Sequence, residues 1–216
     1  MSVRSGYNVR SFSILSAIFC LMTLAGCAQG EHGPSQISVA NSGDLISQGK
    51  PVTSTTAYYD HDEGLFQAGE SFPPSNVVDG NGGDTELPGG GWSYWLAADH
   101  VVDSAVTIDL GDNYKISKIS LQDTHNREYR DRGAKDFVIT AAASAGGPFW
   151  EIGGGAFTQD EWANLTIKDI PINVGAPNNV ARYVRVHVLS CWGCRSVGLN
   201  EVMVFGVPAT GAKTGG

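Results

Sequence analysis

Hydrophobic and polar residues alternate along much of the chain. Val106, Ile108 and Leu110 are separated by Thr107 and Asp109. A period of two places one set of side chains on the buried face of a β-strand. The same alternation recurs at 119–121, 137–139, 165–167, 184–188 and 202–204. No segment keeps a helical hydrophobic stripe for three turns, so the pattern predicts an all-β sandwich of about eight strands.

Turn-forming residues separate these segments. Glycine, asparagine and proline are concentrated at 111–113, 145–148, 153–155 and 177–179. The chain has 28 glycines and only 17% charged residues, which is typical of short strands joined by tight turns. Its 216 residues are enough for one domain with a sizeable core.

Residues 1–26 have the composition of a secretory signal peptide. Arg4 and Arg10 precede an uncharged hydrophobic run that is too short to cross a bilayer as a permanent helix. The run ends in Leu-Ala-Gly followed by Cys27, which resembles the lipobox of bacterial lipoproteins. The resemblance implies that Cys27 is acylated and becomes the first mature residue. The alternative is an ordinary signal peptide cut near Ala28.

The remainder of the chain divides into three parts. Residues 27–44 are small and polar and predict a flexible tether, 45–207 hold the strands, and 208–216 have the composition of a disordered tail. Without the two arginines of the signal peptide the net charge changes from −8 to −10. An acidic domain argues against nucleic acid as a partner, and any membrane attachment would come from the lipid on Cys27 alone. We expect the domain on the bacterial cell envelope, at the outer membrane if the host is Gram-negative, because Ala28 rather than aspartate follows the cysteine.

Two cysteines remain in the predicted domain, as Cys191-Trp192-Gly193-Cys194. Outside the cytoplasm such a close pair is expected to be oxidised. A redox-active pair needs a helix N-terminus to lower one thiol pKa, whereas this motif lies between two strand patterns. Cys191 and Cys194 are therefore predicted to form a disulfide that locks a loop.

An acidic, glycine-rich turn at 78–85 is the best metal candidate. Calcium takes six to eight oxygen ligands from carboxylates, amides and backbone carbonyls. Asp79, Asn81 and Thr85 lie close enough in sequence to supply several of them. The alternative is an acidic turn that binds nothing.

The order of motifs resembles the discoidin, or coagulation factor V/VIII type C, family, which shares its fold with family 32 carbohydrate-binding modules. The segments that carry the resemblance are 49–54, 76–80, 106–111, 181–186 and 198–206. It spans about residues 45–206 and implies a galactose-binding-like jelly roll whose loops hold a ligand at one end. Two departures fall in loops, where ligand identity is set: an insertion at 86–91 and a long, charged segment at 124–133.

The resemblance also implies individual site residues. In similar modules a glutamate on the last strand completes the calcium site, and Glu201 holds that position. Family 32 modules commonly bind sugar with a histidine, an arginine and an aromatic residue of the last loop, which suggests His125, Arg130 and Trp192.

Sugars present flat C–H faces, on which aromatic rings stack, and a rim of hydroxyls, which arginine and histidine can bond. The full set of ligand candidates is His125, Arg127, Arg130, Arg132, Tyr58, Tyr59 and Trp192. The alternatives are that Arg130 and Arg132 form surface ion pairs with Asp131 and Asp136, and that Trp192 covers the disulfide. Trp92, Trp95 and Trp150 are expected in the core.

These features predict a noncatalytic module that binds a glycan and is displayed on the envelope by a lipid anchor. No Gly-x-Ser-x-Gly, His-Glu-x-x-His or phosphate-binding loop occurs in the sequence. One alternative is a protein-interaction or adhesion module of an envelope assembly. Another is a lipid-anchored hydrolase that uses the acidic cluster at 60–63.

Overall fold

The computed structural model describes residues 43–56, 58, 72–173, 179–193 and 195–209. The predicted signal peptide, Cys27 and nearly all of the tether lie outside these residues, as do Tyr59, the cluster at 60–63, Cys194 and the tail from 210. Within the described residues, no helix has the length and hydrophobicity needed to span a membrane.

The described residues form ten strands, one short α-helix and two 3-10 segments. In chain order these are β1 (Asp44–Leu45), β2 (Val52–Ser54), η1 (Pro74–Val78), β3 (Trp95–Leu96), β4 (Ser104–Gln122), η2 (Arg127–Tyr129), β5 (Asp136–Ala142), β6 (Trp150–Ala156), α1 (Gln159–Ala163), β7 (Ile167–Ile170), β8 (Val180–Val188), β9 (Gly198–Leu199) and β10 (Glu201–Pro208). The predicted all-β, jelly-roll class is confirmed.

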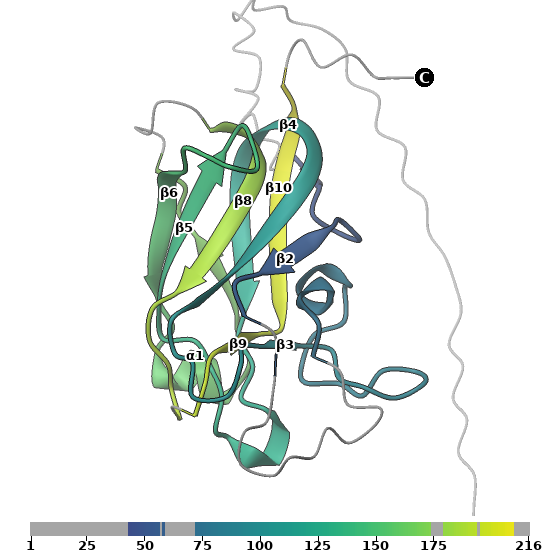
Figure 1. Cartoon of the computed structure of the whole chain (residues 1–216), viewed down its shortest axis with the longest axis vertical. Coiled ribbons are helices and arrows are strands. Elements are labelled where there is room, and N and C mark those ends of the chain that lie inside the picture. Colours follow the sequence, from purple (N-terminus) through teal and green to yellow (C-terminus); the bar gives the residue numbers. More distant parts are fainter. Residues whose placement is uncertain (1–42, 57, 59–71, 174–178, 194, 210–216) are drawn as a thin grey trace, which may run out of the picture. The chain divides into compact units, whose positions relative to one another are not determined.

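The long strand β4 joins the two parts of the sheet. Its first part pairs with β2 and β8, and its second part pairs with β10 and β7. The order β1-β10-β4-β8-β5-β6 is antiparallel throughout, and β3 pairs separately with β9. Figure 1 shows β4 bending over at the top of the fold, while β3, β9 and α1 lie at the bottom.

Two predicted turns lie inside strands. The turn expected at 111–113 is a bend within β4, where Gly111 has a φ of +88° and the register with β8 shifts. The glycines at 153–155 belong to β6. A Cβ on Gly154 would lie 3.0 Å from the carbonyl oxygen of Phe137 on β5, so close strand packing accounts for glycine there. The turn at 145–148 is confirmed between β5 and β6, with the N–H of Gly147 donating to Ser144 at 3.0 Å.

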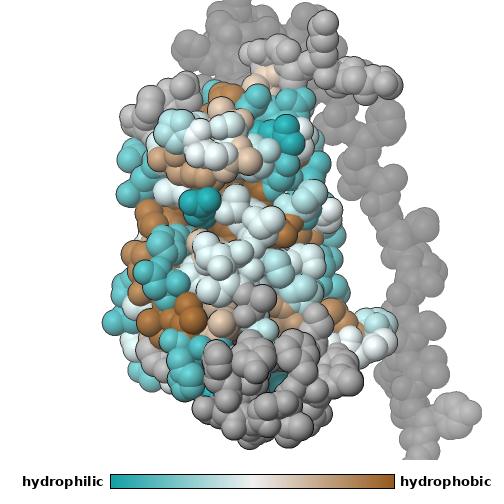
Figure 2. Space-filling model, viewed as in Figure 1, coloured by the Kyte–Doolittle hydropathy of each residue, from teal (hydrophilic) through white to brown (hydrophobic). Residues whose placement is uncertain are grey.

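The core is built from the alternating residues. Val106, Ile108 and Leu110 of β4 are fully buried, as are the valines of β8 that face the same interior. Trp95 is fully buried as predicted, and Trp150 is partly buried against the same core. On the face shown in Figure 2, hydrophobic residues form separate patches among hydrophilic ones.

The core placement predicted for Trp92 is wrong. Trp92 is partly exposed and packs on a separate small cluster of Phe72, Tyr94 and Leu96. The reason is the inserted segment, which forms a small hairpin closed by a bridge between Glu86 and Trp92 and so holds the indole outside the main sandwich core.

Candidate functional site

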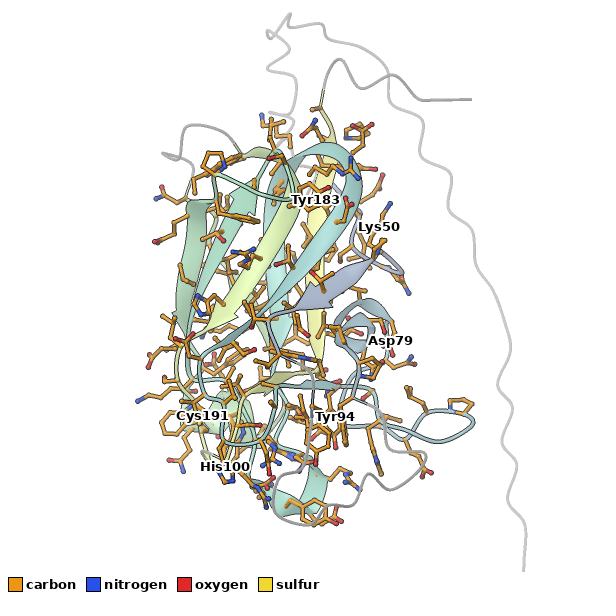
Figure 3. The ribbon with its side chains drawn as sticks, in the orientation of Figure 1. Lys50, Asp79, Tyr94, His100, Tyr183 and Cys191 are labelled. Atoms are coloured by element: carbon orange, nitrogen blue, oxygen red, sulfur yellow. The ribbon has the colours of Figure 1, made fainter. Side chains whose placement is uncertain are left out.

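Several loops meet at the end of the sandwich that carries β3 and β9. They are the segments 84–94, 123–133 and 189–197. Figure 3 labels Tyr94 and Cys191 at this end, which we call the β3–β9 end, and Tyr183 at the opposite end, which we call the Tyr183 end.

An arginine surrounded by aromatic rings lies at the β3–β9 end. The guanidinium carbon of Arg127 is 3.8 Å from the centroid of the Trp92 ring and 5.0 Å from that of Tyr129. Its Nε donates to the hydroxyl of Tyr94 at 3.1 Å, and that hydroxyl donates to Oδ1 of Asn126 at 2.7 Å. Tyr129 is 59% exposed, so this group reaches the surface.

Further aromatic rings extend the same group. Phe72 lies 5.1 Å from Tyr94 and 4.9 Å from Tyr58, between ring centroids. We refer to the whole group as the aromatic cluster, and its members are Tyr58, Phe72, Trp92, Tyr94, Arg127 and Tyr129. The structure thus brings together two predicted ligand residues, Arg127 and Tyr58.

A single buried carboxylate holds the loop beneath the aromatic cluster. The side chain of Asp84 is 3% exposed. Its Oδ2 accepts the backbone N–H groups of His125 at 3.2 Å and Arg127 at 3.0 Å. Its Oδ1 accepts the hydroxyl of Thr124 at 2.6 Å and the side-chain amide of Asn200 at 2.8 Å. Asp84 therefore connects three separate loops.

The loop held by Asp84 has an unusual backbone. Asn126, Arg127 and Arg130 have φ values of 57°, 59° and 49°, in the left-handed region. Residues other than glycine adopt this region at an energetic cost, so surrounding contacts must maintain it. The N–H of Arg127 donates to Asp84, and Nδ2 of Asn126 donates to Asp131 at 2.8 Å.

His125 and Arg130 lie beside a different tryptophan from the one predicted. The His125 ring meets Trp162 edge-on at 6.2 Å, and the Arg130 guanidinium is 5.9 Å from the Trp162 ring. Trp162 comes from α1, and its indole N–H donates to the carbonyl of Arg132 at 2.9 Å. A Cβ on Gly133 would overlap this indole, so glycine is needed at that position.

Trp192 belongs to another set of contacts. Its indole N–H donates to the carbonyl of Phe157 at 2.9 Å, and the ring packs against the main core with Lys135 at 5.1 Å. Cys191 is 7% exposed, and its predicted partner lies outside the described residues. The described contacts of Trp192 are with Phe157 and the core, and its part in ligand binding stays a prediction.

Arg132 is buried rather than on the surface. It is 3% exposed and donates to Asp99 at 2.7 Å and to Asp131 at 2.8 Å. Asp99 also accepts from Arg195 at 2.8 Å. The expected pairing with Asp131 is present, but the expected surface location is wrong, because this network lies beneath the loops. Asp136, the other expected partner, bonds to Ser190 at 2.5 Å.

The predicted calcium ligands Asp79 and Glu201 come together. Glu201 is 7% exposed and accepts the N–H of Gly80 at 2.8 Å. Burial, together with the neighbouring Asp79 carboxyl, raises the pKa of Glu201 from 4.5 to about 8. The N–H of Asn81 donates to Asp79 at 2.7 Å, and the hydroxyl of Thr85 donates to the carbonyl of Gly82 at 2.7 Å.

The Asp79–Glu201 pair supplies two carboxylates to any metal ion bound there. Across the described residues, no group of three or more histidine, cysteine, aspartate or glutamate side chains is placed to hold a metal. An ion at the Asp79–Glu201 pair would therefore need amide, hydroxyl and backbone oxygens as well, which suits calcium.

Sequence reasoning missed several residues of this end. Asp84 was grouped with the acidic turn, and Tyr94, Asn126 and Trp162 were not singled out. The sequence signal for Asp84 is its place directly after two glycines. The partners of Asp84 are 40 or more residues away in sequence, so spacing could not reveal them.

The described residues thus form an antiparallel β-sandwich with arginine and aromatic side chains gathered on the loops of one end. The match to a known family is specific: residues 52–201 match the F5/8 type C domain, and the chain belongs to that family. The predicted resemblance is confirmed. No curated protein matches the chain.

Solved structures share the fold. A chitosan-binding module of a chitosanase/glucanase from Paenibacillus sp. IK-5 has a TM-score of 0.52 and 19% identity, covering 76% of this chain and 99% of its own. A family 32 module from Clostridium perfringens, solved with GalNAc-β-1,3-galactose, has a TM-score of 0.54 and 17% identity, covering 75% and 99%. Another from the same organism, solved with galactose, has a TM-score of 0.53 and 15% identity, covering 74% and 97%. At these identities the likeness establishes the fold alone.

Proposed function

We propose that this protein is a noncatalytic carbohydrate-binding module that holds a glycan at the β3–β9 end. The observation that carries the proposal is the aromatic cluster, where Arg127 stacks on Trp92 and donates to Tyr94. Aromatic rings offer a surface for the C–H face of a sugar, and the arginine and tyrosine beside them can bond its hydroxyls. The family and the three solved modules, which bind chitosan or galactose-containing sugars, support this choice.

His125 and Arg130 form the second part of the proposed site. They lie on the same loop as Arg127, and both approach Trp162. A glycan longer than one sugar could contact both the aromatic cluster and this pair. Tyr59 remains a proposed ligand residue, and Trp192 is proposed as a secondary one, because its indole is bonded to Phe157 and packs on the core.

A glycan array probed with the full chain is the experiment that tests this function. We expect binding to a sugar, with Arg127→Ala abolishing the signal and Arg182→Ala at the Tyr183 end leaving it unchanged. Capture of a partner protein with no sugar bound would favour an adhesion module instead. Turnover of a glycan would overturn the noncatalytic assignment and direct attention to the acidic cluster at 60–63.

Envelope display through a lipid is the second element of the proposed function. It is supported by the lipobox-like Leu-Ala-Gly followed by Cys27 and by the hydrophobic run before it. Cys27→Ala should release the protein from the membrane fraction. A variant that still sediments with membranes, together with no acyl group by mass spectrometry of the wild type, would contradict the lipid anchor.

A structural calcium ion is the third element. Asp79 and the mostly buried Glu201 carry like charges when both are ionised, and a bound cation would relieve their repulsion. Asn81 and Thr85 are the proposed additional ligands from the same turn. Such an ion would fix the turn at 78–85 against β10 and take no part in catalysis.

A further inference from the structure

Asp84 differs from the other buried aspartates of the β3–β9 end in what it binds. Asp99 accepts from two arginine side chains. Oδ1 of Asp123 accepts the N–H groups of Thr124 and Ala134, both at 2.8 Å. Asp84, like Asp123, accepts two backbone N–H groups, but its two lie on both sides of Asn126, where the chain is left-handed. The same oxygen also lies 3.1 Å from Nδ1 of His125.

The two loops that form the aromatic cluster are joined twice. At one junction the carboxylate of Asp84 accepts the backbone N–H of Arg127 at 3.0 Å. At the other, the side chain of Arg127 stacks on Trp92 and donates to Tyr94, which lie on the same loop as Asp84. The stacking of Arg127 on Trp92 therefore depends on the backbone bond to Asp84, because a shift of the Arg127 backbone would move its guanidinium off the Trp92 ring.

A third loop is tied to the same carboxylate. Asn200, between β9 and β10, donates to Asp84 at 2.8 Å and accepts from the hydroxyl of Ser93 at 3.1 Å. The hydroxyl of Ser93 in turn accepts the N–H of Thr85 at 2.9 Å. Asn200 and Ser93 thus fix the position of the Asp84 carboxylate, whose oxygens accept hydrogen bonds from the Thr124–Arg127 segment.

We propose that Asp84 is the positioning residue of the ligand site: its carboxylate sets the left-handed backbone at Asn126 and Arg127 and so directs the Arg127 guanidinium onto Trp92. This role rests on the proposed glycan site, which it deepens. A carboxylate suits it because both oxygens accept. An asparagine would place its NH2 group either against the two backbone N–H donors or against the side-chain NH2 of Asn200.

The test compares Asp84→Asn with Asp123→Asn in the full chain. Asp123 is a matched control, since it is also buried, it precedes the same loop, and it also accepts two backbone N–H groups. Oδ2 of Asp123 accepts no hydrogen bond from the described residues, so an asparagine there can keep the oxygen that accepts from Thr124 and Ala134. Hydrogen exchange of the His125 and Arg127 amides should accelerate about tenfold in Asp84→Asn and stay within about twofold in Asp123→Asn. An Arg127 amide that stays protected in Asp84→Asn would overturn the proposal.

Binding of GalNAc-β-1,3-galactose, used as the probe, gives the second readout. Asp84→Asn should weaken binding at least tenfold, while Asp123→Asn should not. If the wild type fails to bind this probe and every sugar on the array, the proposed function is wrong, yet the amide exchange still decides the positioning role.

A milder variant covers the case in which Asp84→Asn does not fold. Thr124→Val removes one donor to the Asp84 carboxylate and leaves the N–H donors of His125 and Arg127 in place. It also removes the hydroxyl that accepts the N–H of Asn126 at 3.1 Å, so the Arg127 amide, not the Asn126 amide, is the readout. We expect exchange of the Arg127 amide to increase by a smaller factor than in Asp84→Asn. Unchanged exchange in a folded Thr124→Val protein, with Asp84→Asn unfolded, would count against positioning and favour a purely structural role.

Discussion

The two ends of the sandwich each contain an aspartate, an arginine and a tyrosine, but they combine them differently. At the Tyr183 end, Arg182 donates to both oxygens of Asp109, at 2.7 and 2.8 Å, beside the Tyr183 ring. The paired side chains are 40% and 27% exposed. At the β3–β9 end, the carboxylate of Asp84 accepts two backbone N–H groups and two side-chain donors, and Arg127 contacts Trp92 and Tyr94.

The Tyr183 end therefore carries a surface ion pair, whereas the β3–β9 end carries an arginine and aromatic rings held by a buried carboxylate. An ion pair in contact with water contributes little to the free energy of unfolding. At the Tyr183 end, both oxygens of Asp109 accept hydrogen bonds from the Arg182 guanidinium. A buried carboxylate that accepts backbone N–H groups fixes a loop and lets a separate arginine face aromatic rings. Substitutions of the same residue types at the two ends should therefore have different effects on stability and on sugar binding.

The largest loss of stability is expected for Asp99→Ala. This carboxylate lies between Arg132 and Arg195, and Arg132 is only 3% exposed. Its removal would leave a buried arginine uncompensated on one side, at a cost of about 3–5 kcal/mol. Urea denaturation measures the change. A loss below about 1 kcal/mol would show that the β3–β9 end relies on its buried charges no more than the Tyr183 end does.

The next largest effect concerns calcium and pH. Glu201 binds its proton more tightly in the folded protein, because its pKa is raised from 4.5 to about 8. The calcium-free protein should therefore lose stability as pH rises from about 4.5 to about 8. Calcium at a hundredfold excess over its Kd should restore about 2.7 kcal/mol at the upper end of this range.

Calorimetric melting curves with chelator and with calcium test this expectation, and Glu201→Gln is the matched variant. It should remove both the pH slope and the calcium response. A wild-type melting temperature that does not change with calcium would contradict the proposed metal site, and it would not bear on the sugar site.

A smaller, local effect distinguishes two tryptophans. Trp92→Ala should weaken sugar binding about tenfold, or about 1.4 kcal/mol, because it removes the ring on which Arg127 stacks. Trp192→Ala should reduce stability more than affinity, since its indole is bonded to Phe157 and packs on the core. Calorimetric titration and thermal melting of both variants check this. The reverse pattern would make Trp192, in place of Trp92, the main stacking ring of the site.

The smallest effect is expected at the Tyr183 end. Arg182 lowers the pKa of Asp109 from 3.8 to about 2. The pair therefore stabilises the fold above pH 3.8, and this contribution is lost as pH falls through about 2. Asp109→Asn should cost at most about 1 kcal/mol at neutral pH, because the pair is partly exposed. Denaturation at several pH values should show the difference between wild type and variant shrinking with acid.

The strands could be predicted from the sequence because their signal is local. Alternation at Val106, Ile108 and Leu110 reflects burial on one face, and the structure buries all three completely. The family motifs likewise follow one another along the chain. The sequence predicts a turn at Gly111, where the structure has a bend inside β4, because a glycine with positive φ suits both settings.

The site could be predicted only in part, because its contacts are not local. Arg127 was a candidate from residue type, but its partner Trp92 was expected in the core, and nothing in the spacing links Asp84 to Asn200. The charge of the loop at 124–133 indicated ligand-binding residues, but the sequence did not show that Arg132 is buried and pairs with Asp99. Burial of a charged side chain depends on which loops cover it, and that is a property of the folded chain.

Mapping a bound sugar by NMR tests the central claim most directly. With the 15N-labelled full chain and galactose or GalNAc-β-1,3-galactose, we expect shifts of the Trp92 indole N–H and the Arg127 Nε–H. The amides of Arg182 and Tyr183 should not change. Shifts confined to the Tyr183 end, or none at the β3–β9 end with a sugar that binds, would contradict the account.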